Sequence, residues 1–335
     1  GAYNMKGGVA AAAEALLAIA SVADRLSGEI WVAGVAGESE KAQVRGLARD
    51  FNGPDYLGGG IGADRLLATG PKVDAVVVCE PSGLTVVNAQ PGYLLIQLRV
   101  LGRSRYLPSP ADPTAIKGLA AVIAALEAWA ATYADRAAID CGTGILRPTT
   151  TIGAVEAGAP YKPGGAPDAA ALYLDVRVPP GLDADDLVAE IRATAAGALG
   201  SHGPTSGLTL ETEVFARNVP GAITPVDHPL VQAAQQARTS TLGLPTERVP
   251  DADLTAGDDG KVFARAGIPY VKIGPGSATG RDPRFGREQV RIDDLEMAAR
   301  IYVELAARLT EPSHDFALTP SRTMGPSPGI GSRMA

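Results

Sequence analysis

Few side chains in this sequence are of the types that most often do chemistry. Histidine occurs only at His202, His228 and His314, and cysteine only at Cys79 and Cys141. Cys79 is a possible nucleophile, but no histidine lies near it in the sequence to activate it. We therefore favour the interpretation that Cys79 is a buried thiol at the end of a strand.

Carboxylates and one serine are the other candidates. Ser39 has no G-x-S-x-G motif around it and no base at a recognisable spacing, so a serine hydrolase is not indicated. Glu38 in "VAGESE" and Glu80 in "VVVCEP" each follow an apolar run. These two are candidates for acid–base chemistry, or they cap loops. Asp258 and Asp259 in "AGDDGKVFARAGIP" are candidates to cap the helix that follows.

Helices and strands alternate in the part of the chain that must position Glu38 and Glu80. Apolar spacing predicts a helix over 5–26, which Gly28 ends. "EIWVAGVAGE" predicts a buried strand, residues 41–51 a helix, and the stretch after "LGGGIGAD" another short helix. "VDAVVVCEP" predicts a second strand that stops at a proline. This alternation is typical of a parallel α/β sheet.

A different pattern begins near Pro91. "YLLIQLRVLG" alternates like a strand with one exposed face, and a long helix is expected over 113–136. The strands "ILRPTTTIGAVEA" and "AALYLDVRVPP", a helix over 184–198 and the strand "LTLETEVFA" follow. The order β-α-β-β-α-β predicts a ferredoxin-like unit. After it, helices are expected over 228–240 and 293–309.

Composition excludes several classes of function. With a net charge of -7 and a pI of about 5.1, the chain shows no basic stripe, so nucleic acid is not an expected partner. No apolar run reaches roughly 18 residues without charges, so no membrane span is expected. Two cysteines fit a reducing, cytoplasmic setting better than a disulfide scaffold.

Seven phrases carry a family resemblance, in order along nearly the whole chain. They are "NMKGGVAAAAEAL", "VAGESE", "VVVCEPSGLTVVNAQPGY", "GRSRYLPSPADPTAI", "LDVRVPPG", "DHPLVQA" and "GIPYVKIGPG". The sequence thereby resembles the di-zinc peptidase family that includes aminoacylases, acetylornithine deacetylase, succinyl-diaminopimelate desuccinylase and carboxypeptidase G. The resemblance implies a mostly parallel-sheet zinc-peptidase-like domain interrupted by a ferredoxin-like α+β lid and dimerisation domain.

The resemblance also divides the chain, whose 335 residues suggest more than one domain. We expect a discontinuous peptidase-like domain over 1–90 and 215–312, a lid and dimerisation domain over 91–214, and a flexible tail over 313–335. The family's first motif, H-x-D, lies upstream of "MKGG". The resemblance therefore implies that this segment is missing from an incomplete sequence, is supplied by a separate N-terminal chain, or was lost.

The family's metal site is altered at several positions. By position, Glu38 is the general base and Glu80 a metal ligand, whereas Asn4, Ser39 and Arg284 replace the bridging Asp, a ligand Glu and the last ligand His. An arginine stays protonated and cannot bind zinc. We expect Arg284 to pair with Glu80 or Glu38, or to point into solvent. The expected cofactor is none or a partial zinc, because the two-zinc site is not intact.

Four residues are expected to bind the ligand. Asp258 and Asp259 match the stretch that lines the family's substrate pocket, and Arg284 takes a ligand position. Tyr106 replaces the lid histidine that, in the family, reaches the partner's active site; its alternative is to pack on the lid.

Two functions of different class follow from the resemblance. The first is an amidohydrolase that uses Glu38 for metal-independent hydrolysis, or acyl transfer, on N-acyl amino acids or small peptide-like ligands. The second is a pseudoenzyme that serves as a dimeric binding or regulatory subunit. A third interpretation is that the chain is a partial or decayed gene product that does not fold stably by itself. The expected partners are a small amide ligand and a second copy bound through the lid.

Overall fold

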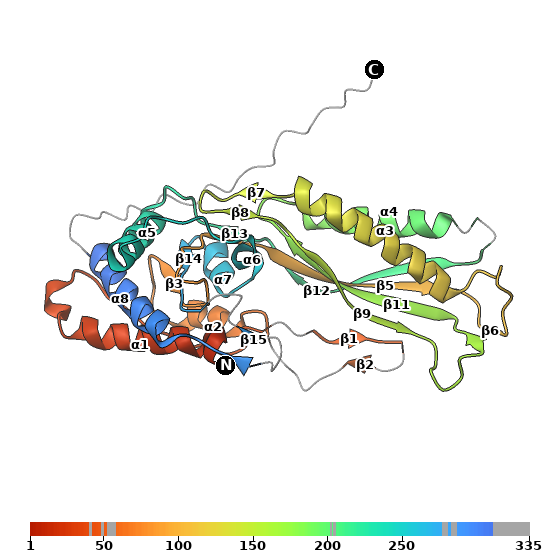
Figure 1. Ribbon diagram of the computed structural model, residues 1–335, viewed down its shortest axis with the longest axis horizontal. Helices are drawn as coiled ribbons and strands as arrows, with labels where there is room; N and C mark the ends of the chain where they lie inside the picture. Colours follow the sequence, from red (N-terminus) through yellow and green to blue (C-terminus); the bar gives the residue numbers. More distant parts are fainter. Residues whose placement is uncertain are drawn as a thin grey trace, which may run out of the picture.

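A computed structural model of the chain describes residues 1–39, 42–47, 50–51, 58–201, 203, 206–276, 281–282 and 287–310. The molecule is elongated, and its two ends form regions with separate hydrophobic cores (Figure 1). We call them the four-stranded region and the helical region. The tail over 313–335 lies outside the described residues.

The four-stranded region is an antiparallel sheet with two helices on one face. Its strands β5 (Gly92–Leu101), β9 (Thr150–Ala157), β11 (Ala169–Val178) and β12 (Thr209–Asn218) lie in the order β12-β5-β11-β9. The helices α3 (Ala115–Arg136) and α4 (Ala184–Gly200) cover the same face (Figure 1). The short pairs are β6 (Arg105–Tyr106) with β10 (Gly165–Ala166), and β7 (Ile139–Asp140) with β8 (Ile145–Leu146). The order of the main elements is the predicted β-α-β-β-α-β.

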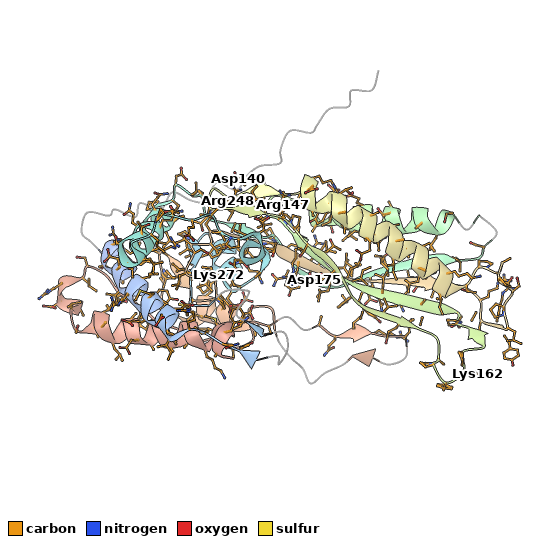
Figure 2. All side chains as sticks on the ribbon, viewed as in Figure 1. Asp140, Arg147, Lys162, Asp175, Arg248 and Lys272 are labelled. Carbon is orange, nitrogen blue, oxygen red and sulfur yellow. The ribbon has the colours of Figure 1, made fainter. Side chains whose placement is uncertain are left out.

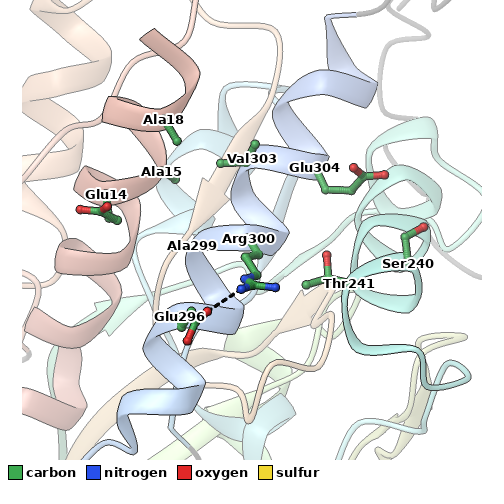
Figure 3. A pocket seen from close by; sticks show the side chains of 10 residues that line it. All are labelled: Glu14, Ala15, Ala18, Ser240, Thr241, Glu296, Ala299, Arg300, Val303 and Glu304. Atoms are coloured by element: carbon green, nitrogen blue, oxygen red, sulfur yellow. Dashed lines mark hydrogen bonds and ion pairs between the residues drawn. The ribbon is translucent and has the colours of Figure 1, made fainter. Parts of the chain in front are cut away.

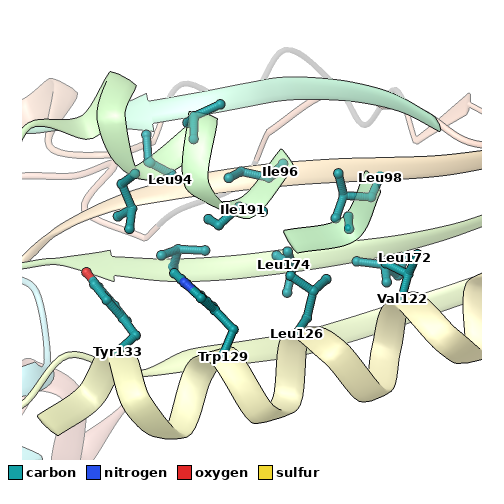
Figure 4. Close-up of a cluster of buried hydrophobic side chains, with 14 of the residues drawn as sticks. Leu94, Ile96, Leu98, Val122, Leu126, Trp129, Tyr133, Leu172, Leu174 and Ile191 are labelled. Atoms are coloured by element: carbon teal, nitrogen blue, oxygen red, sulfur yellow. The ribbon is translucent and has the colours of Figure 1, made fainter. Parts of the chain in front are cut away.

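The core of this region follows from the apolar spacing of α3. Leu119, Val122, Leu126, Trp129 and Tyr133 recur every three or four residues, so they share one helix face, and all are buried. Figure 4 shows this face against leucines and isoleucines of β5, β11 and α4. By length and composition α3 could cross a membrane, but here its apolar face is used inside the protein.

The helical region packs three long helices around a short parallel pair of strands. The helices are α1 (Gly7–Ala20), α5 (Pro229–Leu242) and α8 (Ile292–Leu309), and the pair is β3 (Val76–Val78) with β14 (Tyr270–Lys272). Shorter helices are α2 (Ile61–Thr69), α6 (Asp251–Thr255) and α7 (Gly260–Arg265); helical turns span Ala2–Lys6 and Ala23–Arg25. The remaining pairs are β1 (Val44–Arg45) with β2 (Asp50–Phe51), β4 (Ala89–Gln90) with β13 (Ala222–Ile223), and β15 (Arg281–Asp282) with β16 (Arg287–Glu288).

The fold class is mixed α/β, but the expected mostly parallel sheet is not seen. Among the described strands, β3 and β14 form the one parallel pair, and every other named pair is antiparallel.

Two predicted elements of the helical region are wrong. "EIWVAGVAGE" is not a strand: it has no ladder partner among the described residues, and Trp31, Val32 and Val35 are exposed. An apolar β-branched run becomes a buried strand only where a neighbouring strand pairs with it. The expected helix over 41–51 contains instead the antiparallel pair β1–β2, because this segment contacts the four-stranded sheet.

Candidate functional site

The end of strand β3 is the centre of the candidate site. Val78 is followed by Cys79 and Glu80, and two glycines pack against this backbone. A methyl group at Gly8, the second glycine of "MKGG", would overlap the carbonyl oxygen of Cys79. A methyl group at Gly274, in "GPG", would overlap the carbonyl oxygens of both Cys79 and Glu80. Only glycine permits this approach, which brings α1 and the loop after β14 to the Glu80 backbone.

Glu80 is a buried carboxyl, 7% exposed. Burial, and after it the negative charges of Asp258 and Glu38, raise the pKa of Glu80 to about 8, although Lys272 opposes the shift. Three of the predicted site residues are therefore close enough to act on one another electrostatically. The first and last of them, Glu38 and Asp258, are more than 200 residues apart in the chain.

A buried ion pair lies beside Glu80. Asp258 and Lys272 are almost completely buried, and Lys272 Nζ lies 3.7 Å from Asp258 Oδ2. Lys272 Nζ also donates to the carbonyl oxygen of Asp253 at 2.8 Å. The other carboxylate oxygen of Asp258 accepts from Gln90 Nε2 at 2.6 Å and from the Gly260 amide at 2.7 Å. Figure 2 places Lys272 in the interior of the helical region.

These contacts confirm that an acid caps the helix after "AGDD", and they show which one. Asp258 accepts from the amide of Gly260, the first residue of α7. Asp259 precedes that helix but makes no capping bond with its side chain. Its side chain is half-buried, and burial raises the pKa of Asp259 to about 6, helped by the charge of Asp258.

Glu38 lies at the neck of a loop beside these acids. The amide of Gly60 donates to the carbonyl oxygen of Gly37 at 3.0 Å, so the chain returns to the same point after residue 59. A methyl group at Gly60 would lie 3.1 Å from Asp259 Oδ1, which places the neck against the site. Glu38 itself is half-buried, and Ser39 is exposed.

Cationic side chains form the boundary between the two regions. Lys261 Nζ and Arg177 Cζ lie 5.5 and 5.6 Å from the centre of the Tyr93 ring. Arg177, in "LDVRVPP", also pairs with Asp175 at 2.7 Å. Arg265 donates to the side chain of Asn218. Lys261 Nζ and Arg177 also lie close to Gly257, which precedes Asp258, so positive charge is found beside that part of the site.

Sequence reasoning missed Lys272 and Gln90. A lysine between valine and isoleucine in "YVKIGPG" was the available signal, because a charged residue inside an apolar strand is costly unless it is paired. Gln90 gave no such signal. Its side chain makes two hydrogen bonds with Asp258: Nε2 donates to the carboxylate, and Oε1 accepts from the Asp258 backbone amide at 2.7 Å.

Of the other predicted site residues, Tyr106 lies away from Glu80: it is 75% exposed in β6, at the far end of the four-stranded region (Figure 1). Asn4 has an exposed side chain, and its backbone amide donates to Glu288. Arg284 lies outside the described residues. The role of each stays a prediction.

The structure gives Cys79 and His228, the one described histidine, structural surroundings. Burial raises the pKa of Cys79 to about 11, so at neutral pH it is a neutral thiol and a poor nucleophile. His228 begins α5: its Nδ1 accepts from the Leu230 amide at 3.1 Å. His202 and His314 lie outside the described residues.

The titratable side chains described around Glu80 are carboxyls, a thiol and a lysine. Within the described parts of the chain, no group of three or more His, Cys, Asp or Glu side chains is placed to hold a metal ion. The negative charge of Asp258 is already compensated by the buried ammonium group of Lys272.

A separate groove of about 560 Å³ lies between α1, α5 and α8 (Figure 3). Its floor consists of small residues such as Ala15 and Ala299, and its rim of charged ones. Arg300 on the rim is paired with Glu296 at 2.6 Å. Because none of its lining residues belongs to the group around Glu80 and none of the polar ones is buried, we assign it no chemistry.

Comparison with known proteins gives relatives of one kind. A succinyl-diaminopimelate desuccinylase of Thioalkalivibrio sulfidiphilus (strain HL-EbGR7) is 29% identical over 275 residues, which cover 78% of this chain and 65% of that protein. Among solved structures, the dipeptidase Dug1p of Saccharomyces cerevisiae has a TM-score of 0.57 at 15% identity, covering 76% of this chain and 64% of its own. The YXEP protein of Bacillus subtilis, a dinuclear metal-binding peptidase, has a TM-score of 0.50 at 18% identity, covering 75% and 62%.

The chain thus spans somewhat less than two thirds of the length of these relatives. The structural likenesses, at this low identity, establish the fold alone. A match to the sequence profile of one family extends over residues 1–308, which include every described residue of the candidate site. The chain therefore belongs to peptidase family M20/M25/M40.

Proposed function

We propose that this chain is an amidohydrolase of the peptidase type, acting on N-acyl amino acids or small peptides. The observation that carries the proposal is the convergence of Glu38, Glu80 and the Asp258–Asp259 pair beside the end of β3. The named activities of two relatives, a desuccinylase and a dipeptidase, both cleave amide bonds. An acidic site of this kind suits the proton transfers of such a reaction.

The two glutamates take opposite roles in this proposal. Glu38 accepts a proton from the water that attacks the amide carbonyl carbon. Glu80, with a pKa of about 8, keeps its proton at neutral pH and donates it to the nitrogen of the leaving amine as the C–N bond breaks. Neighbouring acids whose environments separate their pKa values commonly divide acid and base roles in this way.

No step in this proposal passes through zinc. The described donors are carboxyls, one of them neutralised by Lys272, and this set does not fit a two-zinc site. A partial zinc at Glu80 is a separate possibility that elemental analysis of the purified protein tests directly.

Hydrolysis of a substrate panel tests the proposal. N-succinyl and N-acetyl amino acids and dipeptides are incubated with the protein, with and without chelator, and amine release is followed. We expect turnover that chelator leaves unchanged and that Glu38→Gln lowers by about 100-fold or more. Glu14→Gln, an exposed acid of α1, is the matched control and should retain the full rate. Full activity in Glu38→Gln, or complete loss with chelator, contradicts the mechanism.

A binding or regulatory subunit is the second candidate. It is favoured by the absence, among the described residues, of any three-ligand group for a metal. Titration calorimetry with an N-succinyl amino acid should then show binding without product, and Glu38→Gln should bind equally well. Turnover of that compound would exclude this candidate.

We further propose a cytoplasmic homodimer that forms through the four-stranded region as a lid. In support, β9 is an edge strand with Val155 51% exposed, and the exposed Tyr106 would meet a ligand only in a second copy. A separate N-terminal chain is a further proposal, supported by the exposed apolar side chains Trp31, Val32 and Val35. Light scattering of the purified chain should give the mass of two copies; a monomer contradicts the dimer.

A further inference from the structure

Among the described residues between Glu38 and Gly60, residues 42–47 and Gly59 contact the four-stranded region, and we call this segment the loop. Its neck is closed by the hydrogen bond from the Gly60 amide to the Gly37 carbonyl. Asn218, at the end of β12, donates from Nδ2 to the carbonyl oxygen of Gly59 at 3.2 Å. Glu38 therefore sits at a point where the loop, the candidate site and the end of a lid strand meet.

Further along, the described part of the loop over 42–47 is held by the middle of the sheet. Gln97 Nε2 donates to the carbonyl oxygen of Arg45 at 2.8 Å, and the Leu47 amide donates to Glu156 Oε2 at 2.8 Å. Figure 1 shows β1 beside the sheet, on the face opposite α3 and α4. Two backbone groups of the loop are thus bound by side chains from two strands.

A third side chain, Tyr173, links Gln97 and Glu156, the two side chains that bind the loop backbone. The Tyr173 hydroxyl donates to Glu156 Oε2 at 2.6 Å and accepts from Gln97 Nε2 at 2.9 Å. Gln97 is fully buried and Tyr173 is 9% exposed. Polar groups at the centre of a sheet face are costly to bury without partners, so this trio favours the state in which the loop backbone is docked.

The alternation of side chains along β5 places Gln97, and with it Tyr173 and Glu156, on the sheet face that is opposite the apolar core. Ile96 and Leu98 flank Gln97 and face the helices, so Gln97 points to the opposite face. Tyr173 lies directly across from Gln97 on β11. The polar trio is therefore on the one face of the sheet that the loop can reach.

We propose that Glu156, Tyr173 and Gln97 are positioning residues for Glu38: by docking residues 42–47 on the sheet, they keep the Gly37–Gly60 neck closed. Glu38, next to Gly37, is then held at the acids of the site only while the sheet and the loop stay docked. The inference rests on the proposed function only in taking Glu38 as the base.

Amide hydrogen exchange at single-residue resolution tests the coupling. The Leu47 amide reports docking directly, because Glu156 is its acceptor. The Gly60 amide reports the neck and touches none of the substituted side chains. In Glu156→Ala we expect both amides to exchange about tenfold faster or more, and in Tyr173→Phe by a smaller factor in the same direction. Glu156→Gln, which keeps an acceptor oxygen, should restore most of the protection.

Controls separate positioning from general loss of stability. Glu213→Ala removes an acid of the same sheet that pairs with Arg99, and both reporters should then exchange as in the wild type. Amides of β5 and β11 serve as the internal reference and should stay unchanged in every variant. If Leu47 accelerates while Gly60 does not, or if neither changes, the positioning role is overturned.

An activity readout distinguishes this inference from the proposed function. If hydrolysis is found, Glu156→Ala should lower kcat with KM nearly unchanged, because the variant displaces the base rather than the ligand site. If Glu38→Gln proves harmless to hydrolysis, the proposed mechanism fails, yet the Gly60 exchange result still decides whether the loop is coupled to the sheet.

Discussion

The two regions of the molecule bury different kinds of side chain. In the four-stranded region most of the large side chains that are fully buried are apolar or aromatic, such as Leu94, Leu172 and Tyr133, and the fully buried amide side chain of Gln97 is neutral. In the helical region, two of the largest fully buried side chains are lysines, Lys261 and Lys272. One region is held by periodic apolar contacts, and the other includes charges that only specific partners make tolerable.

This difference follows from the lengths of the elements. Strands of eight to ten residues and two long helices give the four-stranded region continuous apolar faces. The strands β3 and β14 have three residues each, and loops that carry Glu80 and Asp258 fill the space around them. Chemistry is therefore concentrated where the fold is least regular, as is common for binding and catalytic residues.

Removing the buried lysine should give the largest effect. Lys272→Met leaves Asp258 buried without its cation, and we expect a loss of about 3–5 kcal/mol in the free energy of unfolding, measured by urea titration. The double variant Lys272→Met with Asp258→Asn should recover much of this, because no lone charge remains. Lys162→Met, an exposed lysine at the far tip in Figure 2, should change stability by about 0.5 kcal/mol or less. Equal costs for the single and double variants contradict the ion-pair account.

A cavity in the apolar core should cost somewhat less and stay local. Leu126 is 1% exposed, and Leu126→Ala should lower stability by about 3 kcal/mol. Because the two cores are separate, hydrogen exchange should accelerate in α3 and β5 but not in α5. Leu305→Ala, in α8, is the matched variant of the other core and should give the reverse pattern. A uniform acceleration over both regions would show that they unfold as one unit.

The pH dependence of the free energy of unfolding should change when the buried Glu80 is neutralised, and should not change when an exposed acid of the four-stranded sheet is neutralised. In protein freed of metal, folded Glu80 keeps its proton up to about pH 8, whereas an ordinary Glu loses it near 4.5. The folded state binds more protons between these values, so stability falls as pH rises through this window. Glu80→Gln should abolish that decline and be more stable than the wild type by about 4 kcal/mol near pH 8. Glu211→Gln, an acid 51% exposed on the sheet, should leave the decline intact.

Much of the four-stranded region could be predicted from the sequence. The period of α3 and the alternation of β5 encode their buried faces, so local pattern and tertiary structure agree there. The same reasoning failed for "EIWVAGVAGE", whose strand pattern finds no partner among the described residues, and for 41–51, where docking on Gln97 and Glu156 overrides local preference.

The candidate site could be predicted only in part. The resemblance gave Glu38, Glu80 and the Asp258–Asp259 pair, and these lie in one neighbourhood. The pairing of Asp258 with Lys272 could not be found, because no local pattern relates residues on a loop and a strand end that meet only in the folded chain. For the same reason, nothing in the sequence indicated that a loop after Glu38 contacts the four-stranded sheet.

The N-caps of one helix in each region should give the smallest change in stability, and only one of the two changes should depend on pH. His228 is the N-cap of α5 in the helical region, and Thr114 is the N-cap of α3 in the other, where its hydroxyl accepts from the Lys117 amide at 3.3 Å. Each change to alanine should cost about 1 kcal/mol near pH 7.5, because an N-terminal amide of the helix loses its acceptor. Burial lowers the pKa of His228, so its imidazole stays neutral and caps above this pKa, and the contribution disappears as pH falls and the ring is protonated. Urea titrations repeated from about pH 7.5 downward should therefore show the His228→Ala cost fall as pH passes below this lowered pKa, while the Thr114→Ala cost persists, since a hydroxyl does not titrate in this range.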